Sequence, residues 1–99
     1  MIVKKDASLR GIDEIMVLIL PKIEKLYEAI GKEFVITSGT DGTHSIGSLH
    51  YKGLAVDIRL PYLTPNANKP FVEMIKLVLN IDFDVVLEKD HIHIEYDPK

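Results

Sequence analysis

Histidine and acidic residues gather in two short segments of this chain, His44–Asp57 and Glu88–Glu95, which together contain all four histidines. Histidine is the side chain that most often binds transition metals, and neutral imidazole combined with carboxylate is a good donor set for zinc. Catalytic zinc is typically held by three protein ligands, which leave one position for water. The sequence therefore predicts a zinc site formed between the two segments.

His91 and His93 are separated by one residue in a segment that reads as a β-strand, HIHIEY. Alternate strand residues point to the same face, so both imidazoles should project together with Glu95. Ile92 and Ile94 then face the other side. This pattern predicts a strand with one buried apolar face and one polar face that carries the site. The alternative is an exposed edge strand with two surface histidines.

His50 and Asp57 lie seven residues apart, with Gly53 between them and a β-rich segment around the aspartate. The glycine predicts a turn into a strand, with His50 on the turn and Asp57 inside the strand, both able to reach one point. Asp57 lies between Val56 and Ile58, where an ionised carboxylate is costly unless it is paired or binds a metal. The alternative is a solvent-facing aspartate on an alternating strand.

Glu88 ends the strand that precedes the HIH segment, next to the histidines. A glutamate beside a zinc site can take a proton from a water on the metal. We therefore interpret Glu88 as the candidate general base. The alternative is a charged residue at a hairpin end, exposed to solvent.

Two helices are expected to support these segments. Apolar residues at helical spacing predict one helix between Asp13, as N-cap, and Gly31, as C′ residue, with Pro21 kinking or splitting it. A second helix is predicted from Asn68, at the cap position, with Pro70 in its first turn. The stretch Pro61–Pro70 before it reads as a loop because its prolines block regular structure.

The remaining regular segments read as strands: Phe34–Thr37, Leu54–Leu60, Phe83–Glu88 and His91–Tyr96. The last two are spaced as a hairpin. The order α, β, β, α, β, β predicts an α+β fold in which a small antiparallel sheet carries helices on one side.

Length and composition limit the classes of protein. The 99 residues allow a single domain over residues 1–99. Twelve Lys and Arg against fifteen Asp and Glu give a net charge of −3, so we expect no nucleic-acid partner. The absence of cysteine excludes disulfides and thiolate ligands. The longest apolar run, Ile15–Leu20, is too short for a membrane span, and no signal peptide is apparent, so we expect cytoplasmic synthesis and a monomer.

Ser48, His50, Gly53, Ala55 and Asp57 form the pattern SxHxxGxAxD, and HIH follows near the C-terminus. This combination resembles the zinc peptidases of the D-Ala-D-Ala carboxypeptidase type, peptidase family M15, and the hedgehog signalling domain that shares their fold. The segment HSIGSLHYKGLAVDI is especially similar to the hedgehog zinc segment. The stretch IEKLYEAIGKEFVITSG resembles the lead-in of the family, so the resemblance covers roughly residues 20–96.

The resemblance implies that His50 and Asp57 are zinc ligands. The third ligand is His93 if the chain follows hedgehog-like sequences, whereas the ExxH pattern of other M15 members would give His91. We favour His93, with His91 beside it as a proton shuttle or oxyanion stabiliser. Glu88 corresponds to the general base, although hedgehog spaces this glutamate one residue further from its HxH.

Further residues are expected to support the site or contact a substrate. His44 matches a hedgehog histidine near the zinc, and Ser48 and Arg59 are candidates of the same kind. M15 peptidases usually place an arginine just after the Ser-Gly turn, where this chain has Thr40–Asp41. Arg59 or Lys52 would have to replace that arginine.

The function implied by the resemblance is zinc-dependent cleavage of peptidoglycan stem peptides, as a carboxypeptidase or an endopeptidase, with water activated by Glu88. A small domain without an export signal fits a bacteriophage or bacterial wall-lytic protein, released by lysis or carried on a virion. The alternative is a non-catalytic, zinc-stabilised module that binds a protein partner, like hedgehog or a component of a phage particle. Calcium is not expected, because only Asp41 remains of the acidic residues that bind it in hedgehog.

Overall fold

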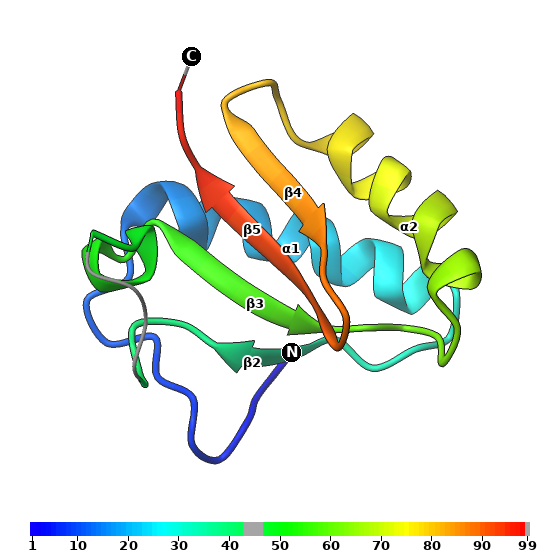
Figure 1. The fold of residues 1–99 in the computed structure, drawn as a ribbon, viewed down its shortest axis with the longest axis horizontal. Helices are drawn as coiled ribbons and strands as arrows, with labels where there is room; N and C mark the ends of the chain where they lie inside the picture. The colour runs from blue at the N-terminus through cyan, green and yellow to red at the C-terminus, as the bar shows by residue number, and fades with distance from the viewer. Residues whose placement is uncertain (43–46, 99) are drawn as a thin grey trace.

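The structure is a computed structural model that describes residues 1–42 and 47–98. These residues form two helices, one short 3₁₀-helix and five strands (Figure 1). In chain order the elements are β1 (Ile2–Val3), α1 (Glu14–Ala29), β2 (Val35–Ser38), η1 (Leu49–Lys52), β3 (Ala55–Arg59), α2 (Pro65–Val78), β4 (Phe83–Leu87) and β5 (His91–Tyr96).

The five strands form one sheet in the order β1-β2-β3-β5-β4. β1 runs parallel to β2, and the other neighbours are antiparallel. The expected α+β class is confirmed, but the sheet is mixed, so the prediction of an antiparallel sheet is wrong at this edge. β1 is only two residues long and exposed, which is too short to carry a recognisable period of two.

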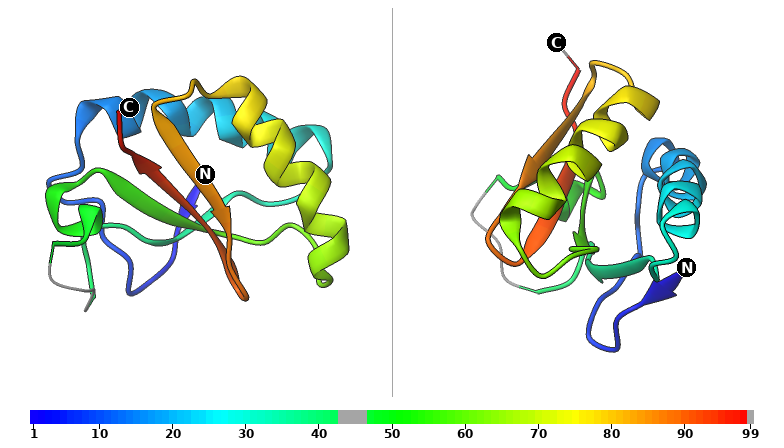
Figure 2. Two further views of the ribbon diagram at one scale, coloured as in Figure 1. Left: turned by 45° about the horizontal axis from the view of Figure 1, so that its top comes forward. Right: turned by 90° about the vertical axis from the view of Figure 1, so that its right-hand side faces the viewer.

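The two faces of the sheet differ in chemistry. Ile58 of β3 pairs with Ile92 of β5, and Val56 pairs with Ile94. These four side chains are fully buried. α1 and α2 lie together on one side of the sheet (Figure 2), and the apolar core forms between the helices and this face. Polar side chains of β3 and β5 therefore point to the other face.

α1 follows the expected boundaries. Asp13 is its N-cap and accepts a hydrogen bond from the backbone N–H of Ile15 at 2.9 Å, while Gly31 adopts a positive φ of 68° just after the helix. The helix continues through Pro21 as one element, so the expected split does not occur. Pro21 lies on the exposed side of α1, where water can hydrate the carbonyl that loses its donor.

α2 begins earlier than predicted. Thr64 is the N-cap and Pro65 occupies the first turn, where the missing N–H of a proline is tolerated. Asn68 is therefore inside the helix, and the interpretation of Pro61–Pro70 as a loop fails for its second half. The fully buried Asn68 side chain accepts from Tyr62 N–H at 3.0 Å and donates to the Tyr62 and Thr64 carbonyls, tying the preceding turn to the helix.

Candidate metal centre

Asp57 and His93 meet because β3 and β5 are antiparallel neighbours. The two residues are direct partners in the register, on the polar face of the sheet. His93 Nδ1 lies 2.9 Å from Asp57 Oδ1. Both side chains are largely buried, since the Asp57 side chain is 13% exposed and that of His93 19%.

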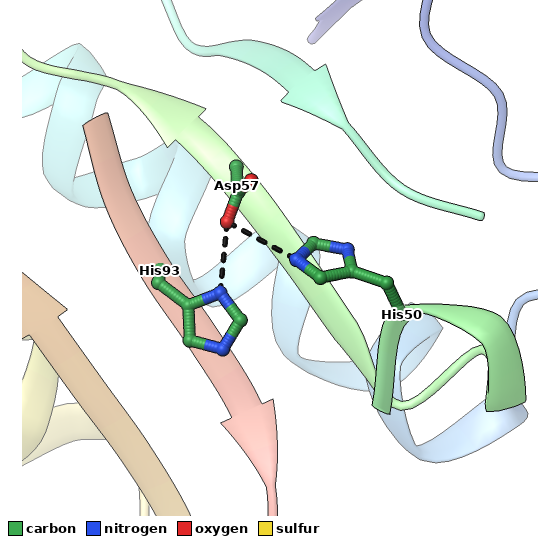
Figure 3. A group of neighbouring side chains, drawn as sticks. All are labelled: His50, Asp57 and His93. Atoms are coloured by element: carbon green, nitrogen blue, oxygen red, sulfur yellow. Dashed lines mark hydrogen bonds and ion pairs between the residues drawn. The ribbon is translucent and has the colours of Figure 1, made fainter. Parts of the chain in front are cut away.

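His50 reaches the same carboxylate from η1. Ser48 caps this short helix, its hydroxyl accepting a hydrogen bond from the backbone N–H of His50 at 3.2 Å. The buried His50 ring then places Nε2 3.4 Å from Asp57 Oδ1. Figure 3 shows both imidazoles directed at the one carboxylate.

Gly53 is required where η1 ends. It has a φ of 72°, a left-handed conformation that favours glycine. A Cβ at this position would lie 2.4 Å from the carbonyl oxygen of Gly11. The Gly53 carbonyl also accepts from the N–H of Asp13 at 2.9 Å. The glycine of the motif therefore ties η1 to the start of α1 and fixes where His50 stands.

The hydrogen-bond partner of one ring nitrogen of His50 determines which nitrogen faces the candidate centre. His50 Nδ1 lies 2.8 Å from the carbonyl oxygen of Gly39, and a carbonyl can only accept, so Nδ1 carries the proton. In neutral His50 the lone pair of Nε2 then faces the Asp57 carboxylate, an arrangement that a cation between the two atoms stabilises. A proton on Nε2, which then donates to Asp57 Oδ1, stabilises the pair in the same way. Metal-binding histidines commonly use this kind of outer hydrogen bond.

Two groups of described residues bring possible metal ligands together: the acidic group Asp84, Glu95 and Asp97, and the group of His50, Asp57 and His93, which contains histidine. Ligand atoms of His50, Asp57 and His93 all lie within 4.8 Å of one another. Two imidazoles and a carboxylate are a donor set suited to zinc, and three protein ligands are typical of catalytic zinc. The residues present therefore fit a zinc ion, and these three residues would hold it.

Electrostatics at the centre favour an ionised Asp57. Partial burial alone would raise the pKa of its carboxyl, but hydrogen bonds from His50 and His93 and the nearby charge of His91 lower that pKa well below its usual range. The pKa of His93 is raised, mainly by its hydrogen bond to Asp57, against the effect of burial. A positive charge beside Asp57, whether a proton or a metal ion, is therefore favoured.

His91 lies at the edge of the same centre. Its Nε2 is 3.6 Å from Asp57 Oδ1, and its Nδ1 lies 2.6 Å from Asp90 Oδ1. Its ring is 29% exposed, more than that of His93. The structure therefore brings His91 next to the three grouped residues, but the imidazole of β5 that lies nearer to Asp57 is that of His93.

Glu88 lies in the turn after β4 and is exposed. Its backbone N–H donates to the carbonyl of His91 at 2.9 Å. Among the described residues, its side chain forms no hydrogen bond or ion pair, so the alternative of a solvent-exposed hairpin residue describes its setting in this structure.

The other predicted site residues are spread around the centre. Arg59 pairs with His91 in the register, is exposed, and lies 3.8 Å from Glu33. Ser48 supports the centre as the cap of η1. His44 lies outside the described residues. Asp41 is one of the two residues that stand where an M15 peptidase would have an arginine. Its carboxylate accepts hydrogen bonds from the backbone N–H groups of Ser8 and Gly39 at 2.7 and 2.8 Å and fixes the turn.

Three supporting groups were not identified from the sequence as partners of the histidines. They are the Gly39 carbonyl on His50, the Asp90 carboxylate on His91, and Glu95, whose Oε1 lies 2.8 Å from His93 Nε2. Glu95 was expected on the same face of β5 as His93, which it follows by two residues, but its bond to His93 Nε2 was not predicted. The Gly39 contact has no signal in the sequence because a backbone carbonyl is present at every position.

Comparisons with protein-family models, with curated proteins and with solved structures find no match to this chain. Among the described residues, neither helix has the length and apolar character needed to cross a membrane.

Proposed function

We propose that this protein is a zinc-dependent peptidase that cleaves peptidoglycan stem peptides, either as a carboxypeptidase or as an endopeptidase. One observation carries the proposal: ligand atoms of His50, Asp57 and His93, from three separate elements, converge within 4.8 Å of one another. The peptide substrate and the setting, a wall-lytic protein released by lysis or carried on a virion, come from the resemblance of the SxHxxGxAxD and HIH motifs to M15 peptidases.

The metal and its three protein ligands define the reaction class. A bound zinc ion lowers the pKa of water towards about 7 and polarises a carbonyl, which is the chemistry that peptide hydrolysis needs. His50 is buried, whereas His93 is 19% and Asp57 13% exposed. The centre is therefore accessible from the polar face of the sheet, as a substrate requires.

Glu88 and His91 are the proton-handling groups in this proposal. The Glu88–His91 backbone bond continues the β4–β5 ladder by one pair. Because Val86 opposes His93, the alternation of strand residues directs Glu88 to the face of the histidines. A Glu88 carboxylate oxygen accepts a proton from the attacking water and returns it to the amine nitrogen as the peptide bond breaks. As an imidazolium, with Nδ1 bonded to Asp90, His91 donates a hydrogen bond from Nε2 to the developing oxyanion.

Arg59 is the candidate substrate cation. It pairs with His91 in the β3–β5 register, two residues along β3 from Asp57. Its guanidinium is 55% exposed and lies 3.8 Å from Glu33, so a substrate carboxylate could compete for it at little cost. Arg59 thus takes the place of the arginine that M15 peptidases carry after their Ser-Gly turn.

The proposal is tested with zinc-loaded protein and muropeptides that carry D-alanine termini or cross-links, with products identified by mass spectrometry. Glu88→Ala should leave one zinc per chain and lower turnover by about 10²–10⁴-fold, the usual contribution of a general base. Arg59→Ala should raise KM more than it lowers kcat. Turnover that survives in Glu88→Ala would exclude Glu88 as the base.

Failure of zinc-loaded wild-type protein to cleave any of these substrates would favour the second function, a zinc-stabilised binding module. The observation that favours this second function is the exposed position of Glu88, whose side chain forms no hydrogen bond or ion pair among the described residues.

A further inference from the structure

Glu95 is a carboxylate on β5 that no step of the proposed reaction uses. Its Oε1 lies 2.8 Å from His93 Nε2, on the side of the ring opposite Asp57. The Glu95 side chain is 25% exposed and that of His93 is 19% exposed, so the bond is partly shielded from water. The two residues are separated by one position of the same strand, which fixes their spacing.

The chemistry of this bond determines which nitrogen of His93 is free. An ionised carboxylate only accepts, so both ring nitrogens of His93 donate when no metal is bound, Nδ1 to Asp57 and Nε2 to Glu95. A metal ion held by Asp57 would replace the proton on Nδ1, while the bond to Glu95 keeps the proton on Nε2. Without Glu95, the ring could flip or carry its proton on Nδ1, and neither state presents Nδ1 to a metal.

Two further carboxylates lie beside Glu95. Carboxylate oxygens of Asp84 and Asp97 lie within 4.8 Å of one another and of Glu95, and Asp84 opposes Glu95 in the β4–β5 register. Glu95 is the member of this acidic group that is bonded to the ring of His93. Replacing Asp84 or Asp97 therefore serves as a control for the direct contact of Glu95.

His91 has a weaker form of the same support. Its Nδ1 lies 2.6 Å from Asp90 Oδ1, but the Asp90 side chain is 86% exposed and precedes His91 in the turn. An exposed turn carboxylate competes with water for the imidazole and holds the ring less firmly than a partly buried one. The difference between Glu95 and Asp90 separates two histidines that the motif alone leaves equivalent.

We propose that Glu95 is a positioning residue that fixes the Nε2–H tautomer and ring orientation of His93, so that Nδ1 of His93 faces the proposed zinc site. The inference rests on the proposed zinc site and deepens it.

The test measures zinc affinity by competition with a chromophoric chelator, and the protonated nitrogen of each zinc-bound histidine by ¹⁵N–¹H NMR. Wild-type protein should show His93 protonated on Nε2. Glu95→Ala should bind zinc about 10–100-fold more weakly and lose that single tautomer. Glu95→Gln keeps an acceptor oxygen, so it should retain the Nε2 proton and bind zinc more tightly than Glu95→Ala.

Asp97→Asn is the matched control, because it removes one charge from the same acidic group and leaves the bond between Glu95 and His93 in place. We expect its zinc affinity to stay within about threefold of wild type, since a screened surface charge contributes little. Circular dichroism establishes whether each variant folds. If Glu95→Ala does not fold, the comparison of Glu95→Gln with the wild-type protein carries the test.

Three results would overturn the role of Glu95 while leaving the zinc site intact. They are wild-type affinity in Glu95→Ala, a proton on Nδ1 of His93 in the zinc-loaded protein, and an equal loss of affinity in Asp97→Asn. Wild-type protein that binds no zinc would instead contradict the proposed function itself.

Discussion

Asp57 has three imidazole neighbours for one carboxylate oxygen. Ring nitrogens of His93, His50 and His91 lie 2.9, 3.4 and 3.6 Å from Oδ1. The pKa of this carboxyl is lowered despite burial, chiefly by the hydrogen bonds from His50 and His93. The lowered pKa keeps Asp57 ionised at pH values where an ordinary aspartate takes up a proton, so Asp57 can bind a metal ion as an anion.

The two histidines of β5 should differ in their importance for zinc. His93→Ala removes one of the three grouped ligand atoms and should weaken zinc binding by at least about 100-fold, because two protein ligands rarely retain the ion. His91→Ala should keep stoichiometric zinc and lose activity through the missing oxyanion donor. Inductively coupled plasma mass spectrometry and muropeptide turnover measure both effects. Zinc lost from His91→Ala and kept by His93→Ala would reverse the assignment.

Residue types and spacing were sufficient to predict which three side chains come together but not their hydrogen-bond partners. His50, Asp57 and His93 could be predicted because the motif fixes their order and the strand period fixes their face. Glu88 was placed correctly at the end of β4, yet its exposure depends on how the hairpin turn packs, which no local pattern encodes. The hydrogen bond between His50 and Gly39 joins residues eleven apart, and a backbone carbonyl gives no signal in the sequence.

At the scale of elements, the turn after β2 supports the candidate metal centre through a hydrogen bond to His50. Gly39 offers its carbonyl to His50, and Thr40 N–H donates to the Ser8 carbonyl at 2.8 Å beside it. A Cβ on Gly39 would lie 2.2 Å from that Ser8 oxygen and 2.9 Å from a methyl group of Leu9. The backbone of residues 8–9 therefore leaves no room for a larger residue.

Gly39→Ala should consequently lower the free energy of unfolding by about 1–3 kcal/mol and weaken zinc binding, because the displaced carbonyl no longer orients His50. Gly31→Ala is the control: an added Cβ there has no neighbour within 4 Å, but the φ of 68° imposes strain. It should reduce stability without changing zinc affinity. Urea unfolding and chelator competition separate the effects, and unchanged zinc affinity in Gly39→Ala would contradict the link between this turn and His50.

Tyr27 of α1 joins the helices to the sheet. Its ring packs against Phe71 and Phe34 at centroid distances of 4.8 and 5.1 Å, and its hydroxyl donates to the carbonyl of Arg59 at the end of β3. The side chain is fully buried, and burial raises the pKa of its phenol above the ordinary value.

This shift predicts a loss of stability in alkaline solution. Above about pH 10 the tyrosine of the unfolded chain releases its proton, whereas folded Tyr27 keeps it, so the free energy of unfolding falls as pH rises. Tyr27→Phe should be less stable near neutral pH by about 1 kcal/mol for the lost hydrogen bond, with a shallower decline. Urea unfolding from pH 8 to 11 tests this, and parallel declines in both proteins would contradict it.

The elements themselves were predictable to different degrees. α1, β3, β4 and β5 lie close to their expected bounds because apolar periodicity and caps specify them locally. α2 starts before the expected Asn68 because a proline at the first helical turn is compatible with a helix, and Pro65 is such a residue. β1 escaped prediction because its pairing with β2 comes from tertiary structure.

For the whole molecule, the division of the sheet into two faces explains how a chain of 99 residues supports a polar site. The apolar side chains of β3 and β5 and the two helices form a core on one face. The other face is thereby free to carry Asp57 and the histidines without interrupting the core. Metal bound there would also tie η1, β3 and β5 together, which stabilises the folded state over the unfolded one.

The central claim is that His50, Asp57 and His93 bind one zinc ion, and elemental analysis of protein purified without chelator and without a histidine tag tests it most directly. We predict about one zinc per chain in the wild-type protein and almost none in Asp57→Ala. Asp84 is a carboxylate on the same face of the sheet, and the control variant Asp84→Asn should retain the wild-type zinc content. A wild-type protein that contains no zinc and takes up none on addition, or an Asp57→Ala variant that loads fully, would contradict the claim.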